Sequence, residues 1–178
     1  IESAGGTERH AALLDAATAS PRGTVVGITG PPGVGKSTLI AALIRRLRAE
    51  GGTVAVLAVD PSSSFTGGAL LGDRTRFRVD PDDAGLFVRS VAARDRLGGL
   101  SDTAIAATAL LRAAFDHVIV ETVGIGQSEA DIALVADVVA LCVQPGAGDT
   151  LQFMKAGIME LPDVFVVTKA DLGPAADR

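Results

Sequence analysis

Residues 30–37 read Gly-Pro-Pro-Gly-Val-Gly-Lys-Ser and fit the pattern G-x-x-x-x-G-K-[ST], between the apolar run Thr24–Thr29 and the helical pattern Ser37–Glu50. This strand–loop–helix context is typical of the phosphate-binding loop of P-loop NTPases. Glycines let backbone N–H groups face phosphate oxygens, and the N-terminus of the following helix attracts anions. The segment predicts a nucleoside triphosphate site, with contacts expected from Gly30, Pro31, Gly33, Val34, Gly35, Lys36, Ser37 and Thr38.

Two side chains of this loop carry the expected chemistry. Lys36 is expected to contact the β- and γ-phosphates as a point charge, and the Ser37 hydroxyl is expected to bind Mg²⁺. The bland alternative is a glycine-rich turn with an exposed lysine. Pro31 and Pro32 leave no second lysine near the start of the loop, which disfavours ATPases with a deviant loop.

The rest of the chain alternates between strand and helix patterns. Continuous rather than alternating apolarity is typical of strands buried on both faces of a parallel sheet. Helices are expected at Glu8–Ala19, Ser37–Glu50 and Ser101–Phe115, and strands at Thr24–Thr29, Val54–Val59, Leu86–Val88, Val118–Val120, Val138–Val143 and Val164–Thr168. We therefore predict an α/β fold of the P-loop NTPase class, with a mostly parallel central sheet flanked by helices on both faces.

Length and charge exclude several classes of protein. The chain has 178 residues, enough for one domain with a buried core. Its net charge of −5 and its lack of Trp and Tyr provide neither the positive surface nor the aromatic side chains that nucleic-acid binding usually needs. No apolar run approaches the roughly 20 residues of a membrane span, and no signal pattern is present. We expect a cytoplasmic or organelle-matrix protein with no membrane partner, in which the single Cys142 is a small core residue.

Acidic residues near strand ends are the first candidates for handling metal or water, because open α/β sheets bind ligands there. Asp60 and Glu121 directly follow expected strands, and Asp73 lies in the long polar segment Pro61–Asp83, which we interpret as a functional loop. Glu121 begins the segment Glu-Thr-Val-Gly124, in which Gly124 can offer its N–H to a γ-phosphate. The segment Glu121–Gly124 would therefore rearrange when the phosphate leaves. Solvated acids without a ligand are the alternative reading of all three positions.

The segment Thr168-Lys-Ala-Asp171 follows the last expected strand. Asp171 can accept hydrogen bonds from the ring N–H and exocyclic amine of guanine, which adenine cannot supply, and the stem of Lys169 can cover the base. The segment favours GTP and GDP as ligands. The alternative is a strand-to-helix turn with an aspartate cap.

Five segments together resemble the MeaB/ArgK-type GTPases, over about Thr24 to Asp171. They are Gly30–Thr38, Asp60–Asp73, Leu97–Leu100, Glu121–Ser128 and Pro145–Asp149. The resemblance implies a metallochaperone-type G protein that gates adenosylcobalamin loading and protects a cobalamin-dependent acyl-CoA mutase, chiefly methylmalonyl-CoA mutase. It also implies a homodimer when full length, and a division into a partial helical extension (1–22) and a GTPase domain (23–178) whose C-terminal part is missing.

The resemblance also assigns residues. It places Asp60, Asp73 and Glu121 beside Mg²⁺, and Asp73 and Glu121 with Lys36 in catalysis. It further implies a nucleotide-sensing loop at Gly146–Gly157, in which Lys155 would stabilise transition-state charge; from the residues alone, Lys155 reads as a solvated helix lysine. Thr168 stands where the family usually has Asn. The similar signal-recognition-particle GTPases also have Thr at this place, in Thr-Lys-x-Asp.

Other functions remain open at this level. One is an ATPase linked to lysine, arginine and ornithine transport, which the absence of a membrane-docking segment disfavours. Another is a metal-insertion GTPase of the hydrogenase or urease type, for which His-rich or paired-Cys tracts are expected and not found. A small-molecule kinase would need a lid and an acceptor pocket. Intrinsic hydrolysis should be slow, with Gln127 the candidate to orient water.

Overall fold

The computed structural model describes residues 8–60, 77, 79–80, 82–93, 100–122, 131–145 and 162–171. Within these ranges the chain forms a six-stranded sheet with the order β3-β2-β4-β1-β5-β6, and every pairing is parallel. The strands are β1 (Thr24–Thr29), β2 (Val54–Asp60), β3 (Leu86–Ala92), β4 (His117–Thr122), β5 (Val138–Val143) and β6 (Val164–Val167). The predicted α/β fold is confirmed.

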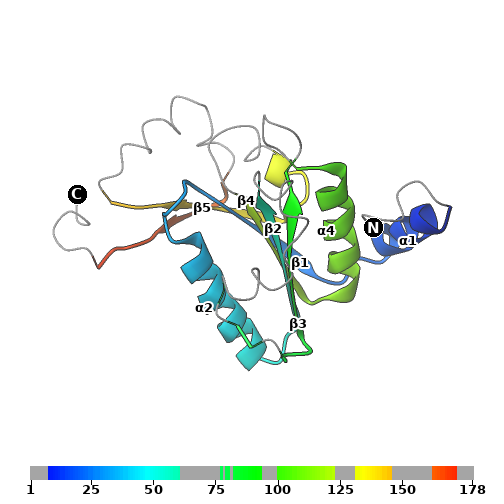
Figure 1. Ribbon diagram of the computed structural model, residues 1–178, viewed down its shortest axis with the longest axis horizontal. Coiled ribbons are helices and arrows are strands. Elements are labelled where there is room, and N and C mark those ends of the chain that lie inside the picture. The colour runs from blue at the N-terminus through cyan, green and yellow to red at the C-terminus, as the bar shows by residue number, and fades with distance from the viewer. Residues whose placement is uncertain are drawn as a thin grey trace.

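Helices cover both faces of the sheet, as predicted. Figure 1 shows α2 (Lys36–Ala49) and α4 (Asp102–Ala114) on opposite sides of the strands, with α1 (Glu8–Ala19) packed against α4. Ser101 caps α4 by accepting a hydrogen bond from the Ala104 N–H. In the part of the chain that the structure describes, no helix has the length and apolarity needed to span a bilayer.

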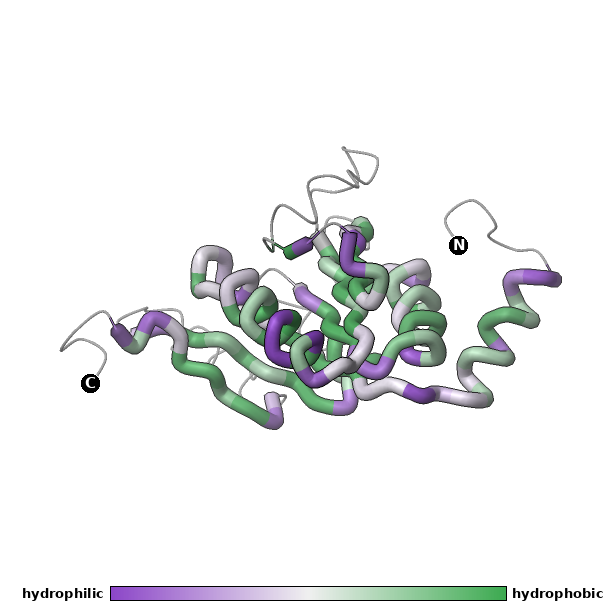
Figure 2. The backbone as a smooth tube through the Cα atoms, turned by 90° about the horizontal axis from the view of Figure 1, so that it is seen from below, coloured by the Kyte–Doolittle hydropathy of each residue, from purple (hydrophilic) through white to green (hydrophobic). Residues whose placement is uncertain are grey.

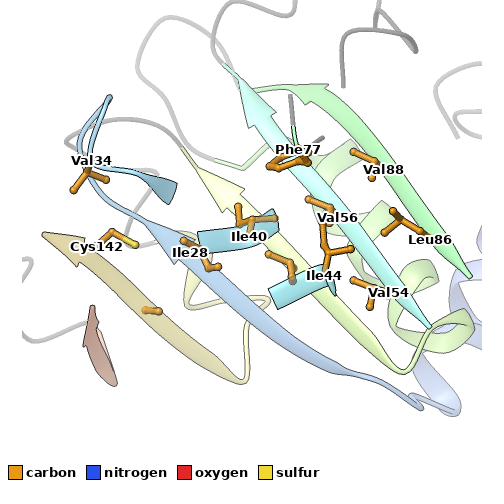
Figure 3. Close-up of a cluster of buried hydrophobic side chains, with 12 residues drawn as sticks. Ile28, Val34, Ile40, Ile44, Val54, Val56, Phe77, Leu86, Val88 and Cys142 are labelled. Atoms are coloured by element: carbon orange, nitrogen blue, oxygen red, sulfur yellow. The ribbon is translucent and has the colours of Figure 1, made fainter. Parts of the chain in front are cut away.

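The apolar side chains form one core on each face of the sheet. On the α2 side, Ile40 and Ile44 pack with residues of β1, β2 and β4 (Figure 3). On the α4 side, Leu100 and Ala104 pack over the alternate residues of β1, β2 and β4. Figure 2 shows that hydrophobic residues, in green, run along the strands between these two cores. Burial of the strands on both faces explains why their sequences are continuously apolar.

Phe77 belongs to the α2-side core although it lies within Pro61–Asp83, the segment expected to be a polar functional loop. Its side chain is 1% exposed and packs near Val56 and Val88, as Figure 3 shows. An isolated aromatic among polar neighbours gives no periodic signal, so the sequence does not predict this burial of Phe77.

One aspartate precedes each of β4, β5 and β6 and joins that strand to the strand beside it. The carboxylate of Asp116 accepts from the Thr53 N–H at 2.9 Å, that of Asp137 from Val25 at 2.8 Å and that of Asp163 from Val139 at 2.8 Å. Each acceptor satisfies a backbone donor at the amino end of a strand. These contacts hold neighbouring strands in register at their amino ends, which lie opposite the phosphate-binding loop.

Candidate nucleotide site

The loop at Gly30–Ser37 leaves the carboxyl end of β1, which lies between β4 and β5, and enters α2. Gly30, Gly33 and Gly35 all have positive φ angles. At Gly30 (φ 140°) a Cβ atom would lie 2.5 Å from the Cys142 carbonyl oxygen, so only glycine lets the loop pass this close to β5. Gly35 precedes α2 and, having no side chain, makes no side-chain cap, so the loop meets the amino end of the helix, where the helix dipole favours an anion.

Lys36 is buried within this loop, with 5% of its surface exposed. Its ammonium group donates hydrogen bonds to the carbonyl oxygens of Gly30 at 2.7 Å and Pro31 at 3.0 Å. The reading of Lys36 as an exposed lysine on a glycine turn is therefore wrong. A buried cation held over backbone carbonyls is positioned to attract phosphate oxygens.

A cavity of about 280 Å³ opens beside Lys36 and brings the loop together with the carboxyl end of β4. Glu121 lines this cavity and is 1% exposed, and it belongs to β4 rather than following it. The expectation that Glu121 lies just past its strand is corrected, because a polar residue ends the apolar pattern without ending the strand. The lining residues are Pro32, Gly33, Gly35, Lys36, Ser37, Thr38 and Glu121.

Beneath the loop, two threonine hydroxyls join β1 to β4. The Thr122 hydroxyl donates to the Thr29 hydroxyl at 3.0 Å, and both side chains are buried. Thr29 is the last residue before Gly30, and Thr122 the last residue of β4. This pair fixes the start of the loop against the strand that carries Glu121.

Thr168 joins the predicted base-binding segment to the phosphate-binding loop. Its hydroxyl lies 2.6 Å from the Val34 carbonyl oxygen and 3.0 Å from that of Val143, and a single hydroxyl proton can be donated to one of them at a time. Lys169 follows with a positive φ of 54° and donates to Gln144 Oε1 at 2.7 Å. Asp171 lies exposed in the turn after β6.

Several predicted residues are not placed by the structure. Asp60 is the last residue of β2 rather than the residue after it, so that expectation is corrected as for Glu121, and only the backbone of Asp60 is described. Outside the described residues lie Asp73, Gly124, Gln127 and the expected sensing loop Gly146–Gly157 with Lys155. Their roles stay predictions.

Two polar residues that contact the candidate site, Thr29 and Gln144, are not predicted from the sequence, whereas the burial of Cys142 is. Thr29 and Gln144 were not singled out, although both are polar residues at the carboxyl end of an apolar strand, the same signal that selected Asp60 and Glu121. Cys142 was expected in the core and is fully buried. Burial raises the pKa of its thiol, while the nearby Lys36 acts to lower it and Glu121 to raise it, so the thiol stays neutral.

Comparison with known proteins gives a family match over the whole chain. The family model described as "Methylmalonyl Co-A mutase-associated GTPase MeaB" matches residues 1–178. A putative GTPase of Pyrococcus horikoshii is 56% identical over 148 residues, which are 83% of this chain and 47% of that protein. The mouse mitochondrial protein named methylmalonic aciduria type A homolog is 43% identical over 147 residues, 82% of this chain and 35% of its own.

The solved structures agree with this match. The crystal structure of a protein named LAO/AO transport system kinase superposes with a TM-score of 0.70 at 34% identity, covering 98% of this chain and 50% of that one. The chain spans about half the length of the Pyrococcus horikoshii GTPase and of the LAO/AO transport system kinase.

Proposed function

The chain belongs to the MeaB family of methylmalonyl-CoA mutase-associated GTPases, and from that membership we propose that it binds and hydrolyses GTP with Mg²⁺ and thereby regulates a cobalamin-dependent acyl-CoA mutase. The observation that carries the nucleotide site is the joint placement of Lys36 and Glu121. A buried cation and a buried acid line one cavity at the start of α2. This arrangement suits a polyphosphate with its counter-ion.

The donor chemistry of the cavity fits Mg²⁺. This ion takes hard oxygen ligands and is usually held by one or two protein side chains together with phosphate oxygens. The Ser37 hydroxyl and the Glu121 carboxylate both line the cavity, and Asp60 ends the neighbouring strand. When bound, Mg²⁺ would neutralise charge on the β- and γ-phosphates. We propose Ser37 as its direct ligand, and Glu121, Asp60 and Asp73 as acids that hold its waters.

The residues of the chain would act on the phosphates mainly by position and charge. Water attacks the γ-phosphorus, the bond to the β–γ bridging oxygen breaks, and GDP leaves with the bond's electron pair while the attacking water loses a proton. Lys36 would balance the charge that develops on the bridging and γ-oxygens. Lys155 is proposed to add a second cation from the sensing loop, and Gly124 to bind the γ-phosphate through its N–H.

Base selection is proposed to rest on Asp171, with the stem of Lys169 covering the base and Thr168 holding the segment in place. The contact of Thr168 with Val34 supports this, because it joins the base-side segment to the loop that would hold the phosphates. A guanine whose ring N–H and amine meet Asp171 is favoured over adenine, which would leave the carboxylate unsatisfied.

The mutase partner is proposed from the relatives rather than from the site. The family model and the mouse relative both carry names that refer to methylmalonyl metabolism. We propose that loading and protection of an adenosylcobalamin-dependent acyl-CoA mutase follow the nucleotide state. Co-purification of the longer natural protein with methylmalonyl-CoA mutase, measured with GDP and with a non-hydrolysable GTP analogue, tests this partner.

A second candidate is a transport-linked ATPase, which the name of the structurally similar LAO/AO transport system kinase suggests. Titration with a fluorescent GDP in Mg²⁺, with competition by unlabelled GTP and ATP, separates the two functions. Displacement by GTP at concentrations at which ATP has no effect supports the GTPase. Equal displacement by ATP would reject guanine selection by Asp171 and favour the ATPase.

A further inference from the structure

Two consecutive residues at the carboxyl end of β5, Val143 and Gln144, accept hydrogen bonds from the first two residues of the predicted base-binding segment, Thr168 and Lys169. The Thr168 N–H donates to the Val143 carbonyl oxygen at 2.9 Å, and one residue further on Lys169 Nζ donates to Gln144 Oε1 at 2.7 Å. The first contact continues the parallel β5–β6 ladder, which pairs Val143 with Val167. The second is a side-chain contact beyond the ladder, so it needs an explanation other than sheet pairing.

Lys169 has an unusual backbone at this point. Its φ of 54° makes it the one non-glycine residue with positive φ in the described part of the chain. This conformation is disfavoured for a residue with a Cβ, and it persists where the surroundings hold it in place. Thr168 supplies one such restraint through Val34, and Gln144 supplies the other at the far end of the lysine side chain.

The contact restricts a side chain that would otherwise be mobile. Lys169 is exposed, and a free surface lysine loses considerable rotamer entropy when its stem is fixed. Gln144 is half-buried and offers its amide oxygen as the acceptor. Fixing the ammonium group sets the direction of the four-carbon stem before any ligand arrives, which lowers the ordering cost of binding.

We propose that Gln144 is a positioning residue for the nucleotide base. It holds Lys169 so that the aliphatic stem presents an apolar surface to the purine ring, and it acts only through that lysine. The inference rests on the proposed nucleotide site and adds a residue to it. The stem contacts either purine alike, so Gln144 sets nucleotide affinity while Asp171 sets the choice of base.

A purely structural role for the pair predicts a different result. An exposed hydrogen bond of this kind adds little to folding stability, and the β5–β6 ladder already joins the two segments. Loss of the acceptor should therefore leave the melting temperature of the nucleotide-free protein unchanged while weakening binding. A structural role would lower the melting temperature and leave affinity alone.

The experiment compares Gln144→Met, which keeps the length and removes the acceptor, with Gln144→Glu, which keeps an acceptor. Titration with fluorescent GDP in Mg²⁺ should show a Kd raised about two- to fivefold for Q144M, the range expected for one exposed charge-assisted contact. The Kd of Q144E should stay within about a factor of two of the wild type. Equal affinity of Q144M and the wild type overturns the proposal.

A double-mutant cycle with Lys169→Met tests whether Gln144 acts through the lysine. K169M keeps most of the apolar stem and removes the ammonium group, so adding Q144M to it should weaken GDP binding no further. Additive losses would overturn the positioning role. Failure of the wild-type protein to bind GDP is a separate outcome, which would reject the proposed function itself.

Discussion

The hydroxyl of Thr168 lies 2.6 Å from the carbonyl oxygen of Val34, a residue 134 positions earlier in the chain. This contact joins the segment expected to bind the base to the loop expected to bind the phosphates. It gives Thr168 a role that does not require direct contact with nucleotide. In this chain the threonine hydroxyl therefore connects the two proposed halves of the site.

Thr168→Val should weaken GDP binding about fivefold, because it removes one hydrogen bond worth about 1 kcal/mol and leaves the Val34 carbonyl without that donor. Isothermal titration with GDP measures the change. Thr168→Ser is the matched control, since it keeps the hydroxyl and should bind within about a factor of two of the wild type. Equal weakening in both variants would show that the methyl group, not the hydroxyl, matters.

Gly30→Ala should abolish nucleotide binding or prevent folding. Its Cβ would lie 2.5 Å from the Cys142 carbonyl oxygen, which is a backbone atom of β5 and not the end of a flexible side chain. Gly51→Ala is the control, because Gly51 also has a positive φ (87°) but nothing within 4 Å of its Cβ position, so it carries only the backbone cost of about 1–2 kcal/mol. Thermal melting and GDP binding of the two variants should differ sharply, and equal behaviour would contradict the close approach.

Thr122→Val should lower the free energy of unfolding by about 1–3 kcal/mol, because a buried hydroxyl on Thr29 loses its partner. Replacing both threonines by valine removes the two polar groups together and should recover part of that loss. Urea denaturation of the two single variants and the double variant measures the coupling. A double variant as unstable as the sum of the single variants would show that the hydroxyls do not interact.

The Asp116 carboxylate at the amino end of the sheet should contribute less to the stability of the fold in acid than at neutral pH. Hydrogen bonds from the Thr53 hydroxyl, then from the Thr53 N–H, lower the pKa of this carboxyl in the folded state, with Arg22 adding a smaller favourable charge. A lowered folded-state pKa means that the stabilisation is complete above the unfolded-state pKa and is lost as pH falls through the folded value. Thermal melting from about pH 6 to about pH 3 should decline less steeply for Asp116→Asn than for the wild type.

A control for this measurement is Asp15→Asn, at an exposed position on α1. Its melting temperature should fall as the pH is lowered, to the same extent as that of the wild type. Asp83 should contribute to the same acid decline, because its hydrogen bonds from Arg48, then from the Gly85 N–H, lower the pKa of its carboxyl. A wild-type profile that stays flat over this range would contradict both assignments.

Much of the fold follows from local sequence. The continuous runs at Thr24–Thr29 and Val138–Val143 predict β1 and β5 at their observed bounds, and the helix at Glu8–Ala19 is also confirmed. The strand predicted to end at Val88 continues to Ala92 as β3. Arg89 and Ser90 break the apolar pattern but not the backbone pairing with β2, which local hydropathy cannot reveal.

The site is less predictable than the fold, because it is assembled from distant segments. The pattern at Gly30–Ser37 identifies the loop by itself, since its chemistry is local. The contacts of Thr168 with Val34 and of Lys169 with Gln144 depend on how β6 lies beside β5. No spacing within the sequence encodes those distances, so the sequence suggests which residues matter without showing which of them meet.

The position of β1 in the sheet has a consequence for the order of folding. Its two neighbours, β4 and β5, are both made long after it, and its pairing with β5 extends as far as Leu141. During synthesis, the strand that leads into the phosphate-binding loop can be held on both sides only after Leu141 has left the ribosome. Nascent chains ending before this residue should therefore not retain nucleotide, so that capture of GTP marks a completed central sheet.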